Sequence, residues 1–161
     1  MIKKFNLFFL TLMYIGKIKY APGTLASLFT CLLFIFLIKF FDNSILFFIS
    51  LLIFLYSFVA INNSFNEFKS DDPQEIVIDE VVGQMLPLLA IPVYETLYLM
   101  PLEFYCISAF LLFRIFDILK PYPINYIDNN VKGALGIMLD DIIAGTYSII
   151  ILILTFYFVG G

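Results

Sequence analysis

The sequence has no histidine, only two cysteines and few charged residues, so several kinds of chemistry are ruled out. Without histidine there can be no histidine nucleophile or base, and most zinc and non-haem iron sites are also excluded. Cys31 and Cys106 lie inside apolar runs with no ligand set nearby, and we interpret both as packing residues. Catalysis would therefore depend on carboxylates, lysines, arginine, hydroxyl groups and a metal that prefers oxygen ligands.

Charge is also scarce relative to apolar residues. Of the 161 residues, 62% are hydrophobic and 14% are charged, and the mean hydropathy is +1.00. This composition indicates a membrane protein and excludes a large soluble domain. The net charge of −4 gives no basic excess, so we expect no nucleic-acid partner.

The apolar runs predict an all-α fold, a multi-pass integral membrane helical bundle of about four to five membrane-embedded helical segments. Residues 1–16 predict a retained N-terminal helix at the membrane surface, and the polar stretch 62–75 predicts a loop. The segments 76–94 and 104–113 are short, and they fit either a kinked crossing hairpin or a re-entrant pair. No repeat or linker divides residues 1–161, so we expect one domain. The predicted embedded segments are 20–38, 44–61, 76–94, 104–113 and 142–159.

If both hairpins enter and return, the chemistry-bearing residues share one membrane face. Eight of the nine basic residues and ten of the thirteen acidic residues would lie there. The positive-inside rule assigns this face to the cytoplasm.

The first candidate motif covers residues 20–27, where Pro22 and Gly23 indicate a turn and Thr24 can cap the helix that follows. A helix N-terminus with free N–H groups can bind an anion. For this motif taken alone, a plain helix cap is the favoured interpretation. Lys17 or Lys19 could neutralise a phosphate there, or could contact lipid headgroups.

Two pairs of adjacent carboxylates form the next motifs, Asp79–Glu80 and Asp140–Asp141. Acids at the edge of the hydrocarbon are costly, and they usually mark function or a partner. Helix capping and the helix dipole are the structural alternatives. Two such pairs on one face favour a site for Mg²⁺, which prefers oxygen ligands and shares its coordination with substrate phosphates.

The last motif places Arg114, Asp117 and Lys120 three residues apart, along one stripe of a helix that must end before Pro121. The stripe fits either two salt bridges or a carboxylate between two cations that face a phosphate. We interpret Asp128, in the loop that follows, as structural.

These motifs closely resemble the phosphatidylglycerophosphatase A family. The matching segments are Ala21 to Thr24, the run Ile76 to Gly83, the run Phe113 to Ile124 and the run Gly136 to Gly145. The resemblance implies a Mg²⁺-dependent lipid phosphatase of the bacterial inner membrane. Such an enzyme removes the terminal phosphate from phosphatidylglycerophosphate and so completes phosphatidylglycerol synthesis.

We expect Mg²⁺ to generate a nucleophile from bound water, although an aspartyl-phosphate intermediate stays open. Asp117 would bind metal or act as a base. Thr24, Arg114, Lys120 and Lys17 would hold the phosphate. The expected metal ligands are Asp79, Glu80, Asp140 and Asp141.

Other phosphatase classes lack their motifs in this sequence. Neither cysteine begins a C-x5-R loop, and there is no D-x-D-x-[TV] run. The D-G-x-x-A-R motif of CDP-alcohol transferases is also missing. The alternative function is a non-enzymatic, ion-binding membrane transporter or assembly factor.

Overall fold

The computed structural model describes residues 2–64, 74–91 and 101–160, and this part of the chain is all-helical, as predicted. A short 3-10 helix, η1 (Ile15–Lys17), accompanies seven α-helices in these ranges. The α-helices are α1 (Ile2–Leu10), α2 (Pro22–Leu37), α3 (Asn43–Ser64), α4 (Ile78–Leu89), α6 (Leu102–Leu119), α7 (Ile124–Asn130) and α8 (Gly133–Gly160).

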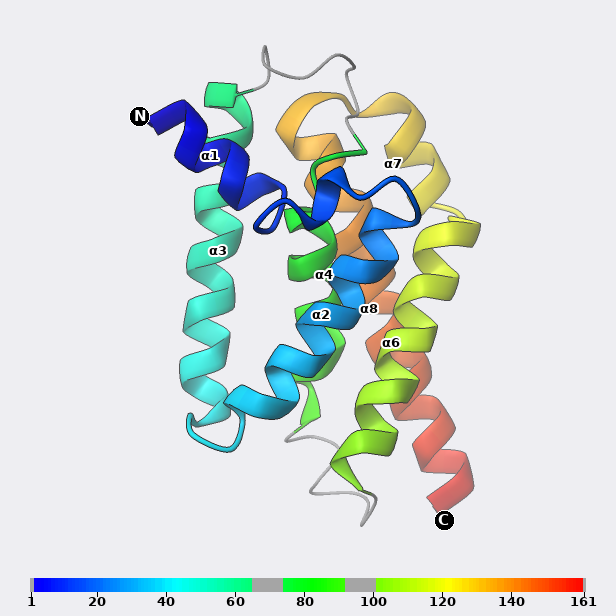
Figure 1. Cartoon of the computed structure of the whole chain (residues 1–161). Helices are drawn as coiled ribbons and strands as arrows, with labels where there is room; N and C mark the ends of the chain where they lie inside the picture. The colour runs from blue at the N-terminus through cyan, green and yellow to red at the C-terminus, as the bar shows by residue number, and fades with distance from the viewer. Residues whose placement is uncertain (1, 65–73, 92–100, 161) are drawn as a thin grey trace.

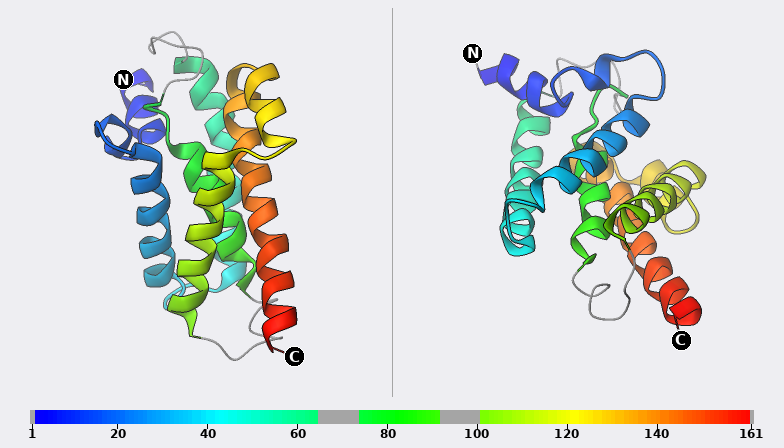
Figure 2. Two further views of the ribbon diagram at one scale, coloured as in Figure 1. Left: turned by 90° about the vertical axis from the view of Figure 1, so that its right-hand side faces the viewer. Right: turned by 60° about the horizontal axis from the view of Figure 1, so that its bottom comes forward.

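Five of these helices, α2, α3, α4, α6 and α8, run along the long axis of the molecule (Figure 1). The helix α4 lies in the middle and contacts the other four. The helix α1 crosses the end at which α2, α4 and α8 begin, and α7 lies at the same end (Figure 2). All the residues predicted to carry chemistry therefore belong to elements that meet at one end of the bundle.

Two contacts with neighbouring helices fix the position of α4 along the axis of the bundle. The Tyr105 hydroxyl on α6 donates a hydrogen bond to the carbonyl of Pro87 on α4. One turn before Pro87, a Cβ added to Gly145 of α8 would lie 2.4 Å from the carbonyl oxygen of Gly83. The backbones of α4 and α8 thus touch, and this brings the two carboxylate pairs to the same level.

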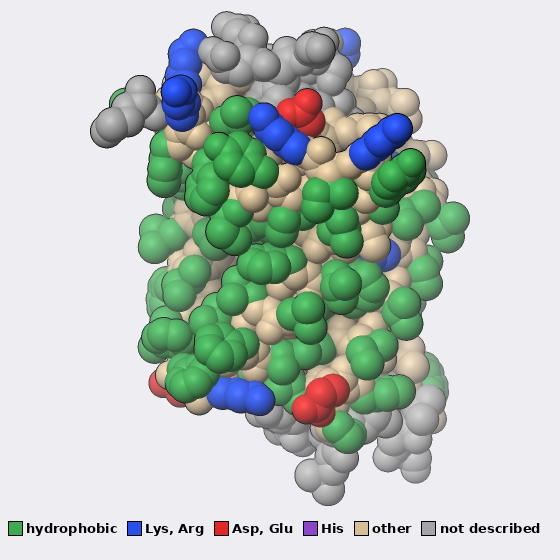
Figure 3. Space-filling model, viewed as in Figure 1, with side chains coloured by type: hydrophobic (Ala, Val, Ile, Leu, Met, Phe, Trp, Pro, Cys, Tyr) green, Lys and Arg blue, Asp and Glu red, His purple; other side chains and the backbone are tan. Residues whose placement is uncertain are grey.

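Two helical stretches are long and apolar enough to cross a membrane, namely α3 and the part of α8 from Gly133 to Thr155. The helix α2 is apolar but shorter. On the face shown in Figure 3, hydrophobic side chains cover the middle of the molecule, and most of the charged side chains lie near its two ends. This distribution is the one expected of a protein that lies within a bilayer.

The helix boundaries differ from the sequence-based expectations in three places. The last helix begins at Gly133 and not at residue 142, so Asp140 and Asp141 lie inside α8 and not at its mouth. The helix α6 extends well beyond the expected 104–113 and ends before Pro121, as predicted. Thr24 does not cap α2, because the helix begins at Pro22 and Ala21 is the capping residue.

The other expected segments correspond to helices. The predicted first hairpin, 20–38 and 44–61, is formed by α2 and α3, and the expected N-terminal helix is α1. The start of the predicted loop 62–75 is helical as far as Ser64, and residues 65–73 lie outside the described residues. The same is true of 92–94 in the expected segment 76–94.

Candidate active site

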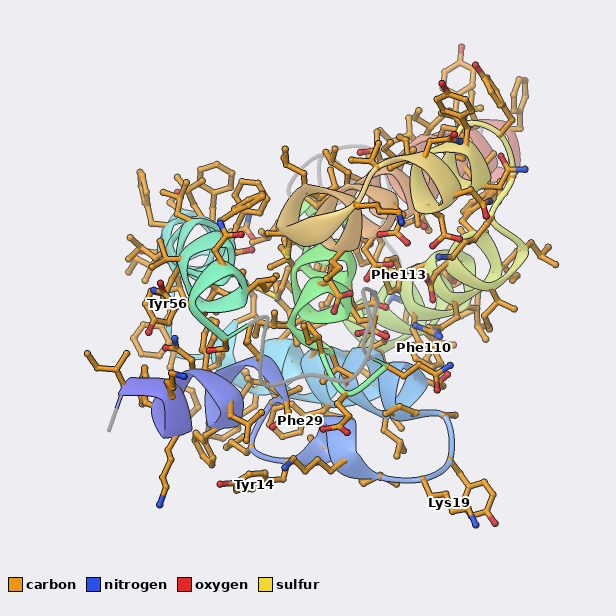
Figure 4. All side chains as sticks on the ribbon, turned by 90° about the horizontal axis from the view of Figure 1, so that it is seen from above. Tyr14, Lys19, Phe29, Tyr56, Phe110 and Phe113 are labelled. Carbon is orange, nitrogen blue, oxygen red and sulfur yellow. The ribbon has the colours of Figure 1, made fainter. Side chains whose placement is uncertain are left out.

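A cavity of about 610 Å³ opens at the end of the bundle where α2, α4 and α8 begin and α6 ends. Figure 4, seen from this end, shows oxygen-bearing side chains that point into the space between α4, α6 and the start of α8. The polar side chains that line the cavity are Lys19, Thr24, Gln74, Asp79, Glu80, Arg114, Asp117, Lys120, Asp128, Asn129, Lys132, Asp140 and Asp141.

Three of the carboxylates form a tight cluster. Asp79 and Glu80, in the first turn of α4, and Asp141 of α8 each offer an oxygen, and these oxygens all lie within 4.8 Å of one another. Asp141 is only 3% exposed. Among the described residues, Asp79 Oδ1 and Glu80 Oε2 are buried and have no hydrogen-bond partner. Buried carboxylates without partners are costly, and a cation between them would remove that cost.

The donor set of this cluster fits Mg²⁺. All three ligands are carboxylate oxygens, which hard divalent cations prefer, and the adjoining cavity leaves room for water and substrate oxygens. Asp140, which the sequence analysis assigned to the same metal, does not belong to the cluster. One of its carboxylate oxygens instead forms an ion pair with a lysine.

That lysine is Lys120, which lies directly after α6 and is held by two acids. Its ammonium lies 2.5 Å from Asp128 Oδ1 on α7 and 2.8 Å from Asp140 Oδ2 on α8. Burial lowers the pKa of Lys120, but the hydrogen bonds and charges of the two carboxylates outweigh burial and raise the pKa well above its usual range. Lys120 is therefore a fixed positive charge on the cavity wall.

Arg114 lies one turn before Asp117 on α6 and spans the gap to α2. One guanidinium nitrogen, Nη1, lies 2.8 Å from Asp117 Oδ2 and 3.4 Å from Ser27 Oγ. Its Nε is buried without a partner among the described residues. Arg114 is thus held by contacts with α6 and α2, and its Nε can still donate a hydrogen bond to a ligand.

The beginning of α2 closes the remaining wall of the cavity. A Cβ on Gly23 would lie 1.8 Å from Glu80 Oε1 and 3.4 Å from Arg114 Nη1, so only glycine fits there without displacing a site residue. The first intrahelical bond joins the Leu25 N–H to the Ala21 carbonyl. The backbone N–H groups of Gly23 and Thr24 precede this bond, and they are available to an anion in the cavity.

The structure brings together nearly all of the residues predicted from the sequence. Lys17 is the exception, because it does not line the cavity and its ammonium lies 5.5 Å from the centre of the Tyr14 ring. Lys19 does line the cavity. The metal, base and phosphate-binding roles of these residues stay predictions.

The sequence analysis included Ser27 in the motif 20–27 without giving it a role, and it missed Lys132. Ser27 lies one helical turn after Gly23, and the structure adds its contact with Arg114. Lys132 precedes the last helix and also lines the cavity. Its place four residues before the run Gly136 to Gly145 could have indicated this.

Comparison with known proteins gives a consistent result. A family model described as phosphatidylglycerophosphatase A matches residues 8–156. A Bacteroides thetaiotaomicron protein, provisionally named a phosphatidylinositol-3-phosphatase, is 37% identical over 90% of this chain and 89% of its own length. Phosphatidylglycerophosphatase A of Haemophilus influenzae is 34% identical over 84% of this chain and 79% of its own length.

The Escherichia coli protein of the same name is 32% identical over 86% of this chain and 74% of its own length. No solved structure gives a significant match. The family model covers the candidate active site from Lys19 to Asp141. The chain therefore belongs to the phosphatidylglycerophosphatase A family.

Proposed function

We propose that this protein is a lipid phosphatase that hydrolyses the terminal phosphate of phosphatidylglycerophosphate and yields phosphatidylglycerol. The observation that carries the proposal is the site itself. A cluster of three carboxylates adjoins a cavity that is also lined by Arg114, Lys120 and Lys19, in a member of this family. An acidic cluster opposite cations suits a phosphate monoester together with a divalent cation.

We place the bundle in the bacterial inner membrane with the candidate active site at the cytoplasmic face. In this arrangement α2, α3, α4, α6 and α8 are the five embedded segments, and α1 lies at the interface. The exposed large apolar side chains on α2, α3 and α6 support the placement, because their exposure to water would be unfavourable. The N-terminal segment before α2, which carries four lysines, lies at the cavity end (Figure 1), and this supports the cytoplasmic assignment.

Asp79, Glu80 and Asp141 would hold Mg²⁺, the cofactor that we propose. The ion would polarise the phosphoryl group and lower the pKa of a bound water. Asp140 supports the site differently, since it and Asp128 keep the ammonium of Lys120 at the cavity wall.

The chain's own cations would bind the phosphate oxygens and stabilise the charge that develops in the transition state. Arg114, kept in place by Asp117 and Ser27, would face the phosphate together with Lys120 and the N–H groups of Gly23 and Thr24. In the reaction, a water oxygen bonds to phosphorus and the bond from phosphorus to the glycerol oxygen breaks. The attacking water loses a proton to a cavity carboxylate, and the glycerol oxygen gains one.

The decisive experiment measures phosphate release by the purified protein in mixed micelles. We expect release from phosphatidylglycerophosphate with Mg²⁺, loss of release with a chelator, and recovery when Mg²⁺ is restored. The Asp79→Asn variant should be inactive, while Asp42→Asn, at the opposite end of the bundle, should behave as wild type. Absence of release from every lipid phosphate tested would favour the non-enzymatic, ion-binding alternative.

A second substrate belongs in the same assay, because the Bacteroides relative is provisionally named a phosphatidylinositol-3-phosphatase. Phosphatidylinositol 3-phosphate also presents a lipid phosphate monoester. We expect a higher kcat/KM for phosphatidylglycerophosphate, whose name two of the relatives carry. The opposite order would reassign the substrate and leave the site unchanged.

A further inference from the structure

A second cavity, of about 310 Å³, lies beneath α1 and between α2, α3 and α4. No charged side chain is found among the described residues that line it. Thr30 is polar, but its hydroxyl already donates to the Ala26 carbonyl at 2.8 Å. The walls of the cavity include Phe8, Met13, Phe29, Leu33, Ile49 and Val81. A cavity of this kind can hold only an apolar group.

One edge of this cavity is formed by a turn with unusual backbone geometry. Leu12, Met13 and Tyr14 have φ values of 44°, 54° and 70°, so three consecutive residues other than glycine adopt the left-handed conformation. Side chains disfavour this region, and such strain tends to collect at ligand sites. The turn places Leu12 and Met13 in the cavity wall.

Two ring contacts connect the cavity to a positive charge. The Tyr14 ring packs edge-on against Phe8 in the cavity wall, with ring centres 5.5 Å apart. The Lys17 ammonium lies 5.5 Å from the centre of the Tyr14 ring. Figure 4 shows Tyr14 and Phe29 near the junction of α1 and α2. A molecule that filled the cavity and emerged beside Tyr14 would meet a cation.

The charge around this opening has one dominant sign. Residues 1–41 contain five lysines and no acid, and four of these lysines lie before residue 20. Among the described residues, Glu75 approaches this region with its backbone, which lies against Gly16. The surface therefore complements a negatively charged headgroup.

We propose that the apolar cavity binds one acyl chain of an anionic phospholipid whose headgroup lies beside Lys17, at a site separate from the candidate active site. By comparison with a cavity of about 150 Å³ that binds benzene, the volume accommodates on the order of a dozen carbon atoms. The helix α4 separates the two sites, because Ile78 and Val81 line the apolar cavity while Asp79 and Glu80 line the polar one. The proposal rests on the membrane placement given above.

Photo-crosslinking tests the proposal with phosphatidylglycerol that carries a diazirine on one acyl chain, and with phosphatidylcholine carrying the same label. With the full-length protein in mixed micelles, we expect peptides of α1, α2 and α3 that line the cavity to be labelled about fivefold more by phosphatidylglycerol, the effect of one lysine near a membrane surface. Equal labelling by the two lipids, or labelling spread over all apolar surfaces, would overturn the proposal.

Matched variants locate the site. Ile49→Trp fills the cavity from α3 and should remove most of the label, whereas Leu52→Trp, on the exposed surface of the same helix, should not. Leu33→Trp fills it from α2 in case the first variant does not fold. Lys17→Gln should abolish the preference for the anionic lipid, and Lys39→Gln should retain it. Unchanged labelling in a folded cavity variant would contradict the proposal.

Phosphate release, measured on the same preparations, separates this inference from the proposed function. A protein that is labelled as expected but releases no phosphate contradicts the function and leaves the lipid site standing. A protein that releases phosphate but shows no selective labelling contradicts the lipid site and leaves the proposed function standing.

Discussion

Gly23 on α2 and Glu80 on α4 approach so closely that a Cβ on the glycine would lie 1.8 Å from Glu80 Oε1. The obstructing atom is the end of a flexible side chain, so a methyl group at this position would displace the carboxylate and leave the helix packing intact. The glycine thus protects the position of a site residue.

We therefore expect Gly23→Ala to lose activity without unfolding. Misplacing a site group by about 1 Å can cost about 100-fold in rate, while the free energy of unfolding should change by no more than about 1 kcal/mol. Phosphate release and thermal unfolding measure the two effects.

Gly83→Ala is the matched variant for which we expect a loss of stability. Its Cβ would lie 2.7 Å from Phe113 Cε2 and 2.8 Å from the backbone oxygen of Asp141, and neither atom can move freely. Overpacking of this kind costs about 1–3 kcal/mol. If Gly23→Ala proved as unstable as Gly83→Ala, the assigned role of Gly23 would be wrong.

The two adjacent aspartates of α8 should behave differently when substituted. Asp141 belongs to the carboxylate cluster, so Asp141→Asn should raise the Mg²⁺ concentration needed for half-maximal activity by at least about tenfold. Loss of a residue that only hydrogen-bonds a metal ligand already lowers metal affinity by about tenfold or more. Asp140→Asn should leave the Mg²⁺ requirement near that of wild type and raise KM for the lipid, because Asp140 holds Lys120. Equal shifts in the Mg²⁺ requirement would return Asp140 to the metal site.

Much of the fold was predictable from the sequence because the signals are local. Apolar runs gave the helices α2 and α3, and Pro121 correctly predicted the end of α6. The start of α8 was missed, since Asp140 and Asp141 looked like the polar boundary of a span. They lie inside the helix because α4 and α6 enclose them in a polar cavity, which is a tertiary effect.

The composition of the site was more predictable than its internal geometry. Motifs alone identified the acids and cations, but adjacent helical residues point about 100° apart. Only the packing of α4 against α8 decides that Asp141 meets Asp79 while Asp140 meets Lys120. The choice of Lys19 over Lys17 likewise depends on the path of the chain between α1 and α2.

The backbone and the charge of Lys120 can be tested separately. Its φ of 41° is left-handed, so Lys120→Gly should recover about 1 kcal/mol of stability relative to Lys120→Ala. Both variants should lack the activity that depends on the ammonium, and Lys120→Arg should keep part of the wild-type activity. Recovery of activity in the glycine variant would show that the backbone, and not the charge, is what the site needs.

The raised pKa of Lys120 predicts how the protein responds to alkali. Because the pKa is higher in the folded state, its ion pairs with Asp128 and Asp140 contribute fully below the unfolded-state pKa of about 10.4 and are lost only as pH rises toward the higher folded value. The difference in stability between wild type and Lys120→Met should therefore stay constant between about pH 8 and pH 10. Unfolding experiments across this interval would reveal a decline if the lysine lost its proton earlier.

The placement of the two ends of the bundle on opposite sides of the membrane can be tested by cysteine labelling. Tyr126 on α7 is 58% exposed beside the candidate active site, and Lys39 is exposed after α2 at the other end. The native Cys31 and Cys106 are buried, so they should add little background. An impermeant maleimide should label Lys39→Cys in cells whose outer membrane has been opened, and Tyr126→Cys only after the inner membrane is broken. Labelling of both from the same side would mean that the long helices do not cross the bilayer, and the proposed cytoplasmic site would have to be abandoned.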